Sequence, residues 1–574
     1  MDSLENEEAR KRLQVFLFSS IAIYFFWVTF IAPPPPPVEG VTEDNFLKKT
    51  DITENKEKKD PITSLIKSGD TEEKQQERLP LEKKQMKSKH VSFDISTVHG
   101  SMGNIHLEKY TQLPKLTSWW GWVFGGMKDS WVPYSGGDEM LNILSAEGSF
   151  VTVGRGDSAA ENVHRLSQQP NGDIKTLAQL NDITIEKTFR FVEGETKLDN
   201  YTVEIDINIK NTSTTAISDL WIGTFEKMSG EAGRFDLVSR PQFFVEDEMV
   251  GTFATMFSTS FLELEDLEEP TKFDSEPQWF GIGSRYFLTA LYPADADQKM
   301  FRSVSTHKLS EDMYGSIATI ASPIDPGATR NIKLKAFIGP KQIDILETLG
   351  DSWTQSVEFG IFGFFSRVLL FLLKIIQAGF TNWGVSILLL TLIVKVIFFP
   401  LTQKAFMSGK KMQALQPLLK ELKEKYKDNQ QLQAQETMKL FKEHDVSPLG
   451  GCLPTLIQLP VWFSLYNVML YSVELYDSSF IYLRDLTSQD PYGILPVLYC
   501  VLMLIQQRMM PMGNLDPMQA KMMKMMPLAF GIFMFTFPSG LVLYFSMNIL
   551  LTIFQQWLIR VQFDESKLLR QEEV

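Results

Sequence analysis

A series of apolar runs in the last third of the chain constrains the fold more than any other feature. The run over 382–401 has twenty residues and a single charge, Lys395. At about 1.5 Å of rise per helical residue, such a run crosses the roughly 30 Å hydrocarbon layer of a bilayer. Further spans are predicted over 449–470, 492–507, 518–537 and 541–559. We therefore expect an α-helical membrane core of five spans within residues 381–560.

The start of the chain predicts a sixth span. Leu13–Ala32 contains no charge and directly follows the basic stretch 10–12. Positive charge at this end favours a cytoplasmic N-terminus. A cleaved signal peptide is the alternative, but no small-x-small cleavage pattern ends the run. We expect residues 1–32 to form a cytoplasmic N-terminus and an uncleaved anchor, and residues 561–574 to form a cytoplasmic tail.

A linker is predicted over residues 33–90. Five prolines at 33–37 favour a stiff polyproline II spacer. The segment 38–90 then holds 12 basic and 12 acidic side chains with almost no aromatic ones. Such a composition buries too little apolar surface to offset the entropy of ordering. We therefore predict a disordered, Pro-rich and charged linker.

The acidity of the chain lies in its middle. The net charge is −14, and residues 91–350 hold 22 basic against 37 acidic side chains. In this segment apolar and polar residues alternate, as in 184–191, 201–210 and 331–338. This period of two is typical of half-buried antiparallel strands. We predict a large all-β sandwich over 91–350, on the side of the membrane opposite the cytoplasm.

Two features of the middle segment leave alternatives open. The aromatic run 119–122 is suited to sugar binding or to ordinary packing, and the acid-rich stretch 236–276 is suited to a cation or to a solvated loop. The only cysteines are Cys452 and Cys500, and the six histidines show no metal-ligand spacing. No phosphate loop, nucleophile elbow or zincin motif occurs. The sequence therefore predicts no metal, no cofactor and no enzymatic activity.

Two helical segments flank the first core span. Residues 351–380 place Arg367 and Lys374 on one face of an otherwise apolar helix, which predicts an amphipathic helix in the membrane interface. Residues 403–447 hold nine lysines against six acids and predict a cytoplasmic helical hairpin with a break at 426–431. The lysines chosen as its candidate contact residues are Lys410, Lys411, Lys420 and Lys423.

Lys395 is the one ionisable group deep in the five core spans. It lies nine residues before the next lysine, and Thr391 lies one turn earlier on the same face. Uncharged polar residues on the other spans are Gln458, Gln506, Thr536, Ser546 and Asn548. These side chains could line a hydrated groove, or Lys395 could extend to the cytoplasmic surface while the others only join helices.

The absence of carboxylates from the five spans argues against an ion-coupled transporter, which normally pairs charges near the midplane. An uncharged polar groove suits another task. It lowers the cost of bringing polar segments of a second protein into the bilayer. Two alternatives remain, namely a small-solute transporter with an outer binding domain and a passive assembly scaffold.

Several motifs carry a resemblance to a known family. They are Asn382–Thr402, Ser447–Pro454, Ile457–Pro460, Asp490–Pro496 and Phe537–Tyr544. In this order they resemble the YidC/Oxa/Alb membrane protein insertases. The anchor and the outer β-domain are similar to the Gram-negative subgroup, which has a large periplasmic domain. The resemblance implies a supersandwich-like periplasmic sandwich and a bacterial inner-membrane location.

The resemblance also implies a function and site residues. Such insertases and chaperones receive nascent membrane proteins from ribosomes and signal recognition machinery, act alone or with the Sec translocon in the lipid bilayer, and use no cofactor. Lys395 occupies the position of the groove's basic residue, which is Arg in many relatives. Thr391 matches a substrate-facing position, and Phe545, beside Tyr544, matches a substrate contact that is often Tyr. The hairpin matches a loop needed for activity.

Overall fold

The computed structural model describes most of the chain from residue 82 to residue 562. The described residues are 82–97, 100–111, 115–116, 134–135, 140–144, 149–155, 158–159, 165–180, 182–192, 194, 196–227, 240–251, 272–295, 299–308, 313–427, 429–444, 453–509 and 517–562. The predicted anchor, the aromatic run 119–122 and most of the acid-rich stretch lie outside these residues.

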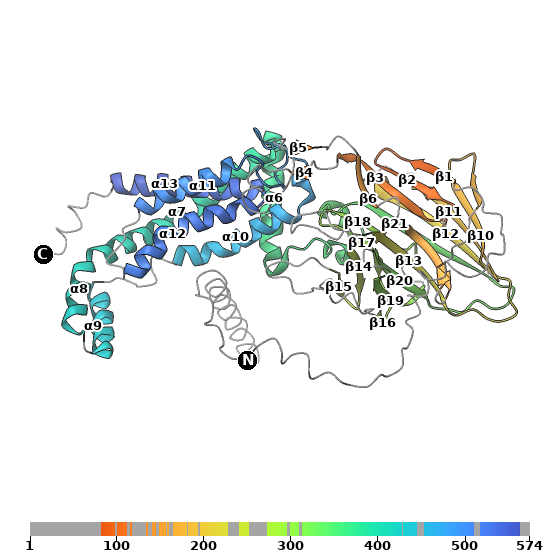
Figure 1. The fold of residues 1–574 in the computed structure, drawn as a ribbon, viewed down its shortest axis with the longest axis horizontal. Helices are drawn as coiled ribbons and strands as arrows, with labels where there is room; N and C mark the ends of the chain where they lie inside the picture. Colours follow the sequence, from red (N-terminus) through yellow and green to blue (C-terminus); the bar gives the residue numbers. More distant parts are fainter. Residues whose placement is uncertain are drawn as a thin grey trace, which may run out of the picture. The chain divides into compact units, whose positions relative to one another are not determined.

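Two antiparallel sheets form the β-domain, as predicted (Figure 1). The first has the order β1-β2-β3-β7-β13-β20-β19-β16, with β6 on β3 and β8 on β7. Its strands are β1 (Lys83–Lys87), β2 (Val91–Ser96), β3 (Met102–Thr111), β6 (Met140–Leu144), β7 (Ser149–Arg155), β8 (Ser158–Ala159), β13 (Leu220–Lys227), β16 (Lys272–Phe273), β19 (Phe301–Lys308) and β20 (Met313–Ile320). A separate two-stranded sheet joins β4 (Lys115–Leu116) and β5 (Tyr134–Ser135).

The second sheet has the order β15-β14-β17-β18-β21-β12-β11-β10-β9. Its strands are β9 (Arg165–Gln168), β10 (Ile174–Leu180), β11 (Ile183–Phe191), β12 (Thr202–Asn211), β14 (Arg240–Val245), β15 (Glu248–Val250), β17 (Trp279–Gly283), β18 (Phe287–Pro293) and β21 (Thr329–Pro340). The three alternating segments of the sequence are β11, β12 and β21, and they lie side by side. Their register pairs Ile185 with Ile209 and Ile207 with Ile332, all buried. The apolar sides of these strands therefore form one continuous core face.

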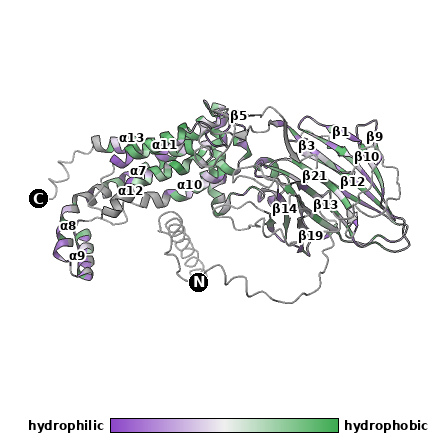
Figure 2. Cartoon of the chain, viewed as in Figure 1, coloured by the Kyte–Doolittle hydropathy of each residue, from purple (hydrophilic) through white to green (hydrophobic). Residues whose placement is uncertain are grey.

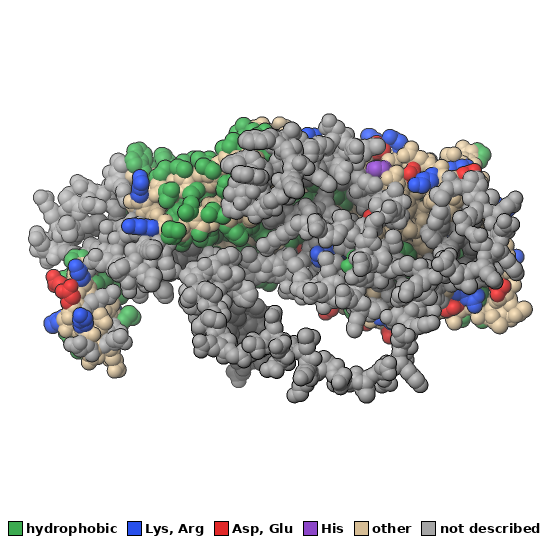
Figure 3. All heavy atoms as spheres, in the orientation of Figure 1, with side chains coloured by type: hydrophobic (Ala, Val, Ile, Leu, Met, Phe, Trp, Pro, Cys, Tyr) green, Lys and Arg blue, Asp and Glu red, His purple; other side chains and the backbone are tan. Residues whose placement is uncertain are grey.

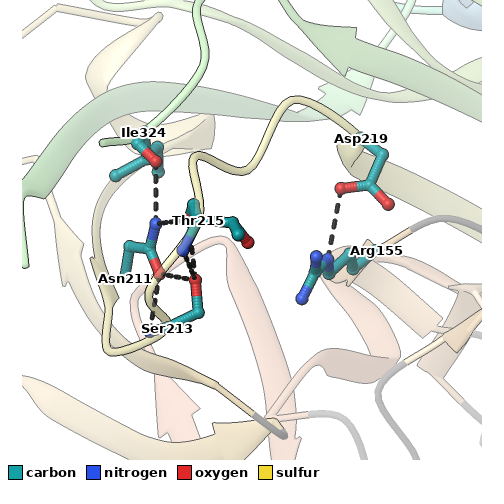
Figure 4. Close-up of polar contacts among 6 residues, drawn as sticks. All are labelled: Arg155, Asn211, Ser213, Thr215, Asp219 and Ile324. Carbon is teal, nitrogen blue, oxygen red and sulfur yellow. Dashed lines mark hydrogen bonds and ion pairs between the residues drawn. The ribbon is translucent and has the colours of Figure 1, made fainter. Parts of the chain in front are cut away.

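A buried asparagine closes the corner after β12 (Figure 4). The Asn211 side chain is fully buried, and its Nδ2 donates to the carbonyl oxygens of Thr215 and Ile324, each at 2.8 Å. Its Oδ1 accepts from the backbone N–H and the hydroxyl of Ser213 at 2.8 and 2.7 Å. The side chain thus satisfies backbone groups that the turning chain removes from the sheet ladder.

The predicted linker extends too far along the chain. Residues 83–87 form β1, which pairs with β2 over five residues and buries Met86. The strand is an edge strand with mostly exposed lysines. Backbone pairing rather than apolar burial holds such a strand, so its composition resembles that of a linker.

Helices make up the rest of the described chain. Two short helices, α4 (Ile343–Leu346) and α5 (Asp351–Thr354), and the 3-10 turn η4 (Gly360–Phe362) lead into the bundle. The long helices are α6 (Gly363–Phe380), α7 (Trp383–Ala414), α8 (Gln416–Lys425), α9 (Gln430–Glu443), α10 (Leu453–Tyr471), α11 (Ile494–Met509), α12 (Pro517–Phe533) and α13 (Ser539–Gln562), with the 3-10 turns η5 (Val473–Leu475) and η6 (Met534–Thr536). The break of the predicted hairpin falls between α8 and α9. The hairpin itself begins later than residue 403, because α7 continues through Pro400 to Ala414.

Three described helices are long and apolar enough to cross a membrane. They are Gly360–Phe380, Trp383–Ser408 and Ser539–Ile559, and two shorter apolar helices cover Ile494–Met509 and Lys524–Thr536. Figure 2 shows these helices as the most continuously hydrophobic part of the chain. Apolar side chains also gather on the visible surface of the bundle in Figure 3, whereas charged ones gather on α8 and α9. Helix α6 has the length of a span, and its position in the membrane interface stays a prediction.

Ion pairs join α6 to the connecting helix α4 and to η5, and an aromatic contact joins the loop after α10 to the β-domain. Lys374 of α6 lies 2.8 Å from Asp344 of α4 and 3.0 Å from Glu474 of η5. The ring of Tyr476, just after η5, meets the ring of Phe287 of β18 edge-on with centroids 5.3 Å apart. The loop between α10 and α11 therefore lies on the same side of the bundle as the β-domain.

Candidate functional site

Three polar residues of α13 face neighbouring helices. Asn548, Thr552 and Gln555 are four and three residues apart, a spacing that puts them on one face of a helix. Each bonds to a polar side chain of another helix. We call these three residues and their partners the polar seam, and its members are Lys395, Thr402, Gln458, Asn548, Thr552 and Gln555.

Lys395 of α7 occupies the middle of the polar seam. Its Nζ donates a hydrogen bond of 2.8 Å to Oγ1 of Thr552, and that hydroxyl donates in turn to the carbonyl oxygen of Asn548 at 2.7 Å. The lysine side chain is half-buried, and the neighbouring Val396 and Ile397 are exposed. Helix α7 therefore turns an apolar face outward and keeps its one mid-span cation against α13. An inward-facing cation is the arrangement expected of a polar group within a membrane span.

Two further contacts extend the polar seam along α13. Gln458 of α10 donates from Nε2 to Oδ1 of Asn548 at 3.2 Å, and both side chains are buried. Gln555 donates from Nε2 to Oγ1 of Thr402 at 2.5 Å. The polar seam therefore links α7, α10 and α13 through uncharged groups and one cation. No Asp or Glu occurs within α7, α10, α11, α12 or α13.

An aromatic group lies on α13 about two turns before Thr552. The ring of Phe545 meets Trp462 of α10 at 6.0 Å and Tyr499 of α11 at 6.3 Å, both edge-on. The hydroxyl of Tyr544 lies near Gln458 and Trp462. No described residue lies within hydrogen-bonding distance and angle of this hydroxyl.

The remaining predicted residues lie at several distances from Lys395. Thr391 is buried one turn away, and its hydroxyl donates to the carbonyl oxygen of Ile387 at 2.6 Å. Gln506 is partly exposed and lies two turns after Tyr499 on α11. Ser546 is buried but lies two residues before Asn548, and a helix turns by about 200° over two residues. Ser546 therefore points away from the polar seam.

Thr536 does not join the group around Lys395. It is exposed in η6, where its carbonyl oxygen accepts from Gln489 of the loop between α10 and α11 at 3.3 Å. From Ser539, where α13 begins just after Thr536, to Thr552 the helix rises by about 20 Å. The structure thus separates Thr536 from Thr552 and Lys395 by about two-thirds of a membrane span.

The candidate lysines of the hairpin fall on two helices. Lys411 lies in the last turn of α7 and Lys420 on α8, both exposed, while Lys410 and Lys423 belong to the same two helices. The site residues predicted from the sequence do not include Thr402, Thr552 or Gln555. The spacing of Asn548, Thr552 and Gln555 on the last apolar run is the signal that identifies the polar face of α13. Among the described residues, no three His, Cys, Asp or Glu side chains gather closely enough to hold a metal ion.

The architecture defines a class of protein: an α-helical membrane protein with an extramembrane β-sandwich and a polar seam made of uncharged side chains and one cation. Two family models match the chain, "60Kd inner membrane protein" over residues 375–566 and "YidC periplasmic domain" over residues 158–372. The chain belongs to the YidC family of membrane protein insertases. The β-domain is accordingly periplasmic, which confirms the predicted fold class.

Curated relatives carry the same family name. The chain is 35% identical over 384 residues to "Membrane protein insertase YidC" of Geobacter sulfurreducens, covering 66% of this chain and 68% of that one. It is also 35% identical over 382 residues to the protein of that name from Francisella tularensis, with the same coverage. A solved structure described as "Active YidC insertase crystal structure with the first transmembrane domain resolved" matches 82% of this chain and 91% of that chain at 17% identity and a TM-score of 0.34.

Proposed function

We propose that this chain inserts and helps fold nascent integral membrane proteins in the bacterial inner membrane. The polar seam lowers the free-energy barrier to moving a client's polar segment into the bilayer. The observation that carries the proposal is the hydrogen bond of 2.8 Å between Lys395 and Thr552. It holds a cation inside the bundle through a neutral partner. A neutral partner can be exchanged for water or for a client's polar group at little electrostatic cost.

The polar seam suits the part of insertion that a bilayer opposes. Each unpaired peptide or polar group brought into hydrocarbon costs several kcal/mol. Donors and acceptors on α7, α10 and α13 reduce this cost when a client's polar segment replaces their mutual contacts. Lys395 adds a positive charge, which favours client segments with carboxylates. No covalent step or cofactor is needed.

The outer faces of the bundle suit the client's apolar part. Large apolar side chains are exposed along α7 and α11, including Val396, Ile397, Val501 and Ile505. We infer that a client's polar end enters beside Lys395 while its apolar helix leaves along these faces into lipid. The hairpin of α8 and α9, with its exposed lysines, then receives clients on the cytoplasmic side.

The proposal extends to topology and partners. Six spans with both termini in the cytoplasm place the lysine-rich hairpin on the side where chains emerge from ribosomes. The partners proposed on the family resemblance are ribosomes, signal recognition machinery and the Sec translocon. Insertion without the Sec translocon is the part of this proposal that purified components can test.

The test is insertion of a short single-span protein, translated in vitro, into liposomes that contain only this chain. Lys395→Glu should abolish insertion because it replaces the cation with an anion that repels client carboxylates. Lys395→Arg should retain it. Thr552→Val should cause a partial loss, because the charge remains while its fixed position is lost. Lys404→Glu makes the same charge change nine residues further along α7 at an exposed position and is the matched control.

Full activity of the Lys395→Glu protein would refute the role of the polar seam. Equal losses in the Lys404→Glu and Lys395→Glu proteins would attribute the effect to net charge instead. Absence of insertion by the unaltered protein would favour a scaffold that works only with the Sec machinery.

A further inference from the structure

A tight turn in the loop between α10 and α11 presents a single apolar side chain. Phe480 and Leu483 exchange two backbone hydrogen bonds, of 2.8 and 2.9 Å, around Ile481 and Tyr482. Ile481 has a φ of +54° and is 87% exposed, more than any other large apolar side chain among the described residues. A β-branched residue in this left-handed region is strained, and asparagine or glycine would fit better. The turn therefore holds an unfavourable residue at its most exposed point.

The turn is firmly attached to the bundle. The ring of Phe480 packs directly onto Gly384, so closely that a Cβ at that position would overlap it. Tyr482 donates from its hydroxyl to Asp490 at 2.9 Å, and the same carboxylate accepts from the backbone N–H of Leu495 at 2.7 Å. Ile481 thus extends from a rigid base, and its exposure does not result from an unattached loop.

These attachments fix the level of the turn relative to the membrane. Gly384 is the second residue of the candidate span Trp383–Ser408, and Leu495 is the second residue of the apolar helix α11. The turn lies at the first turn of both helices, which is where hydrocarbon meets headgroups. The loop also contacts the periplasmic β-domain through Tyr476, so this boundary belongs to the outer leaflet.

Exposed residues beside the ends of α6 and α11 have the character of a membrane interface. Phe380 at the end of α6 is 58% exposed, Tyr492 is 44% exposed and Ile494 at the start of α11 is 51% exposed. The rings of Tyr482 and Tyr492 meet edge-on at 6.0 Å. Aromatic rings are enriched at this level because one end is apolar and the other can hydrogen-bond to headgroups and water.

We infer that the 480–483 turn is a lipid-contact site, in which Ile481 inserts among the acyl chains of the outer leaflet beside α7 and α11. The occupant is the bilayer itself, because the turn continues the exposed apolar surfaces of two membrane helices at their outer ends. Insertion satisfies an apolar side chain that would otherwise be almost fully hydrated. It also anchors the outer ends of α7 and α11 at a fixed depth.

The test places an environment-sensitive fluorophore at position 481. Ile481→Cys is made in the full chain with Cys452→Ala and Cys500→Ala, labelled, and reconstituted into nanodiscs of phosphatidylcholine and phosphatidylglycerol. We expect blue-shifted emission, at least twofold stronger quenching by lipids with a shallow nitroxide than at a control site, and at least threefold weaker quenching by aqueous iodide. The control is Leu177→Cys, a 46% exposed apolar position on β10.

Two results would overturn the inference. One is iodide quenching at position 481 equal to that at position 177, which would place the tip in water. The other is blue-shifted emission without quenching by lipid nitroxides, which would indicate a protein partner or a second copy. A label at Tyr492→Cys, on the same level of the bundle, keeps the test decisive if the first variant fails to fold, and it should show the same lipid quenching.

Discussion

Lys187 of β11 should make the stability of the β-domain depend on pH. The side chain is fully buried, and its Nζ donates to the carbonyl oxygens of Gly100 at 3.1 Å and Val151 at 2.8 Å, across to the first sheet. Both acceptors belong to residues with positive φ, 51° and 70°. Burial lowers the pKa of Lys187 from 10.5 to about 7, because an ammonium loses its hydration inside the sandwich.

The sign of the effect follows from the protons bound in each state. Between pH 7 and pH 10 the unfolded chain keeps the proton on Lys187 while the folded chain releases it. The unfolded state then binds more protons, so the free energy of unfolding rises with pH. At about 1.4 kcal/mol for each pKa unit, this side chain alone should add about 2 kcal/mol between pH 7 and pH 9. Below pH 6 both states are protonated, and its contribution is constant.

The measurement compares urea unfolding of the full chain in detergent, followed by tryptophan fluorescence, for the unaltered protein and for Lys187→Met. Methionine keeps most of the apolar stem and cannot titrate. From pH 7 to pH 9, the free energy of unfolding should rise by about 2 kcal/mol more in the unaltered protein than in the variant. Lys175→Met removes a partly exposed lysine from the neighbouring strand and controls for net charge. Parallel pH profiles for the unaltered and Lys187→Met proteins would refute the reasoning.

Two further predictions concern stability. Asn211→Ala removes the four hydrogen bonds at the corner after β12 and leaves buried backbone groups unpaired, so it should lower the free energy of unfolding by about 2–4 kcal/mol. In the same urea assay, Asn331→Ala, which removes an exposed Asn–Asn hydrogen bond, should cost under about 1 kcal/mol, and equal losses would contradict the account. Ile481→Asn should have a higher thermal midpoint in detergent than Ile481→Ser, because both variants remove the apolar side chain and only asparagine suits the left-handed conformation, which is worth up to about 1 kcal/mol. Equal midpoints for the two variants would show that the turn is not strained.

The sequence predicts the middle of each element better than its ends. The strands β11, β12 and β21 follow from strict alternation because one face of each is buried. The edge strand β1 cannot be predicted in this way, because it is held by backbone hydrogen bonds to β2 that composition does not reveal. Helix α7 continues through Pro400 and past the predicted end at residue 401 to Ala414. A proline is a probable helix boundary only when no packing compensates for the lost hydrogen bond.

The sequence predicts only part of the candidate site. The position of Lys395 is evident from the sequence, because one charge in an apolar run stands out. Its partner Thr552 is not, because a threonine 157 residues away is one of many and only packing selects it. Composition alone groups Thr536 with Lys395, whereas the structure places Thr536 just before the start of α13, away from Thr552. Polarity within a span identifies candidates, whereas depth and helix face decide which of them meet.

The choice of partner explains what the polar seam can accept. An ammonium has three donors, and among the described residues the structure gives Lys395 one acceptor, Oγ1 of Thr552. That hydroxyl donates its own hydrogen bond to the carbonyl oxygen of Asn548, so toward the lysine it can only accept. A carboxylate in its place would neutralise the cation and hold it more strongly. A single hydroxyl keeps the cation in position while leaving its charge and up to two donors for water, a backbone carbonyl or an acidic side chain. Because water and backbone carbonyls are available with every polypeptide, such a polar seam accepts clients of many sequences, with a preference for acidic segments.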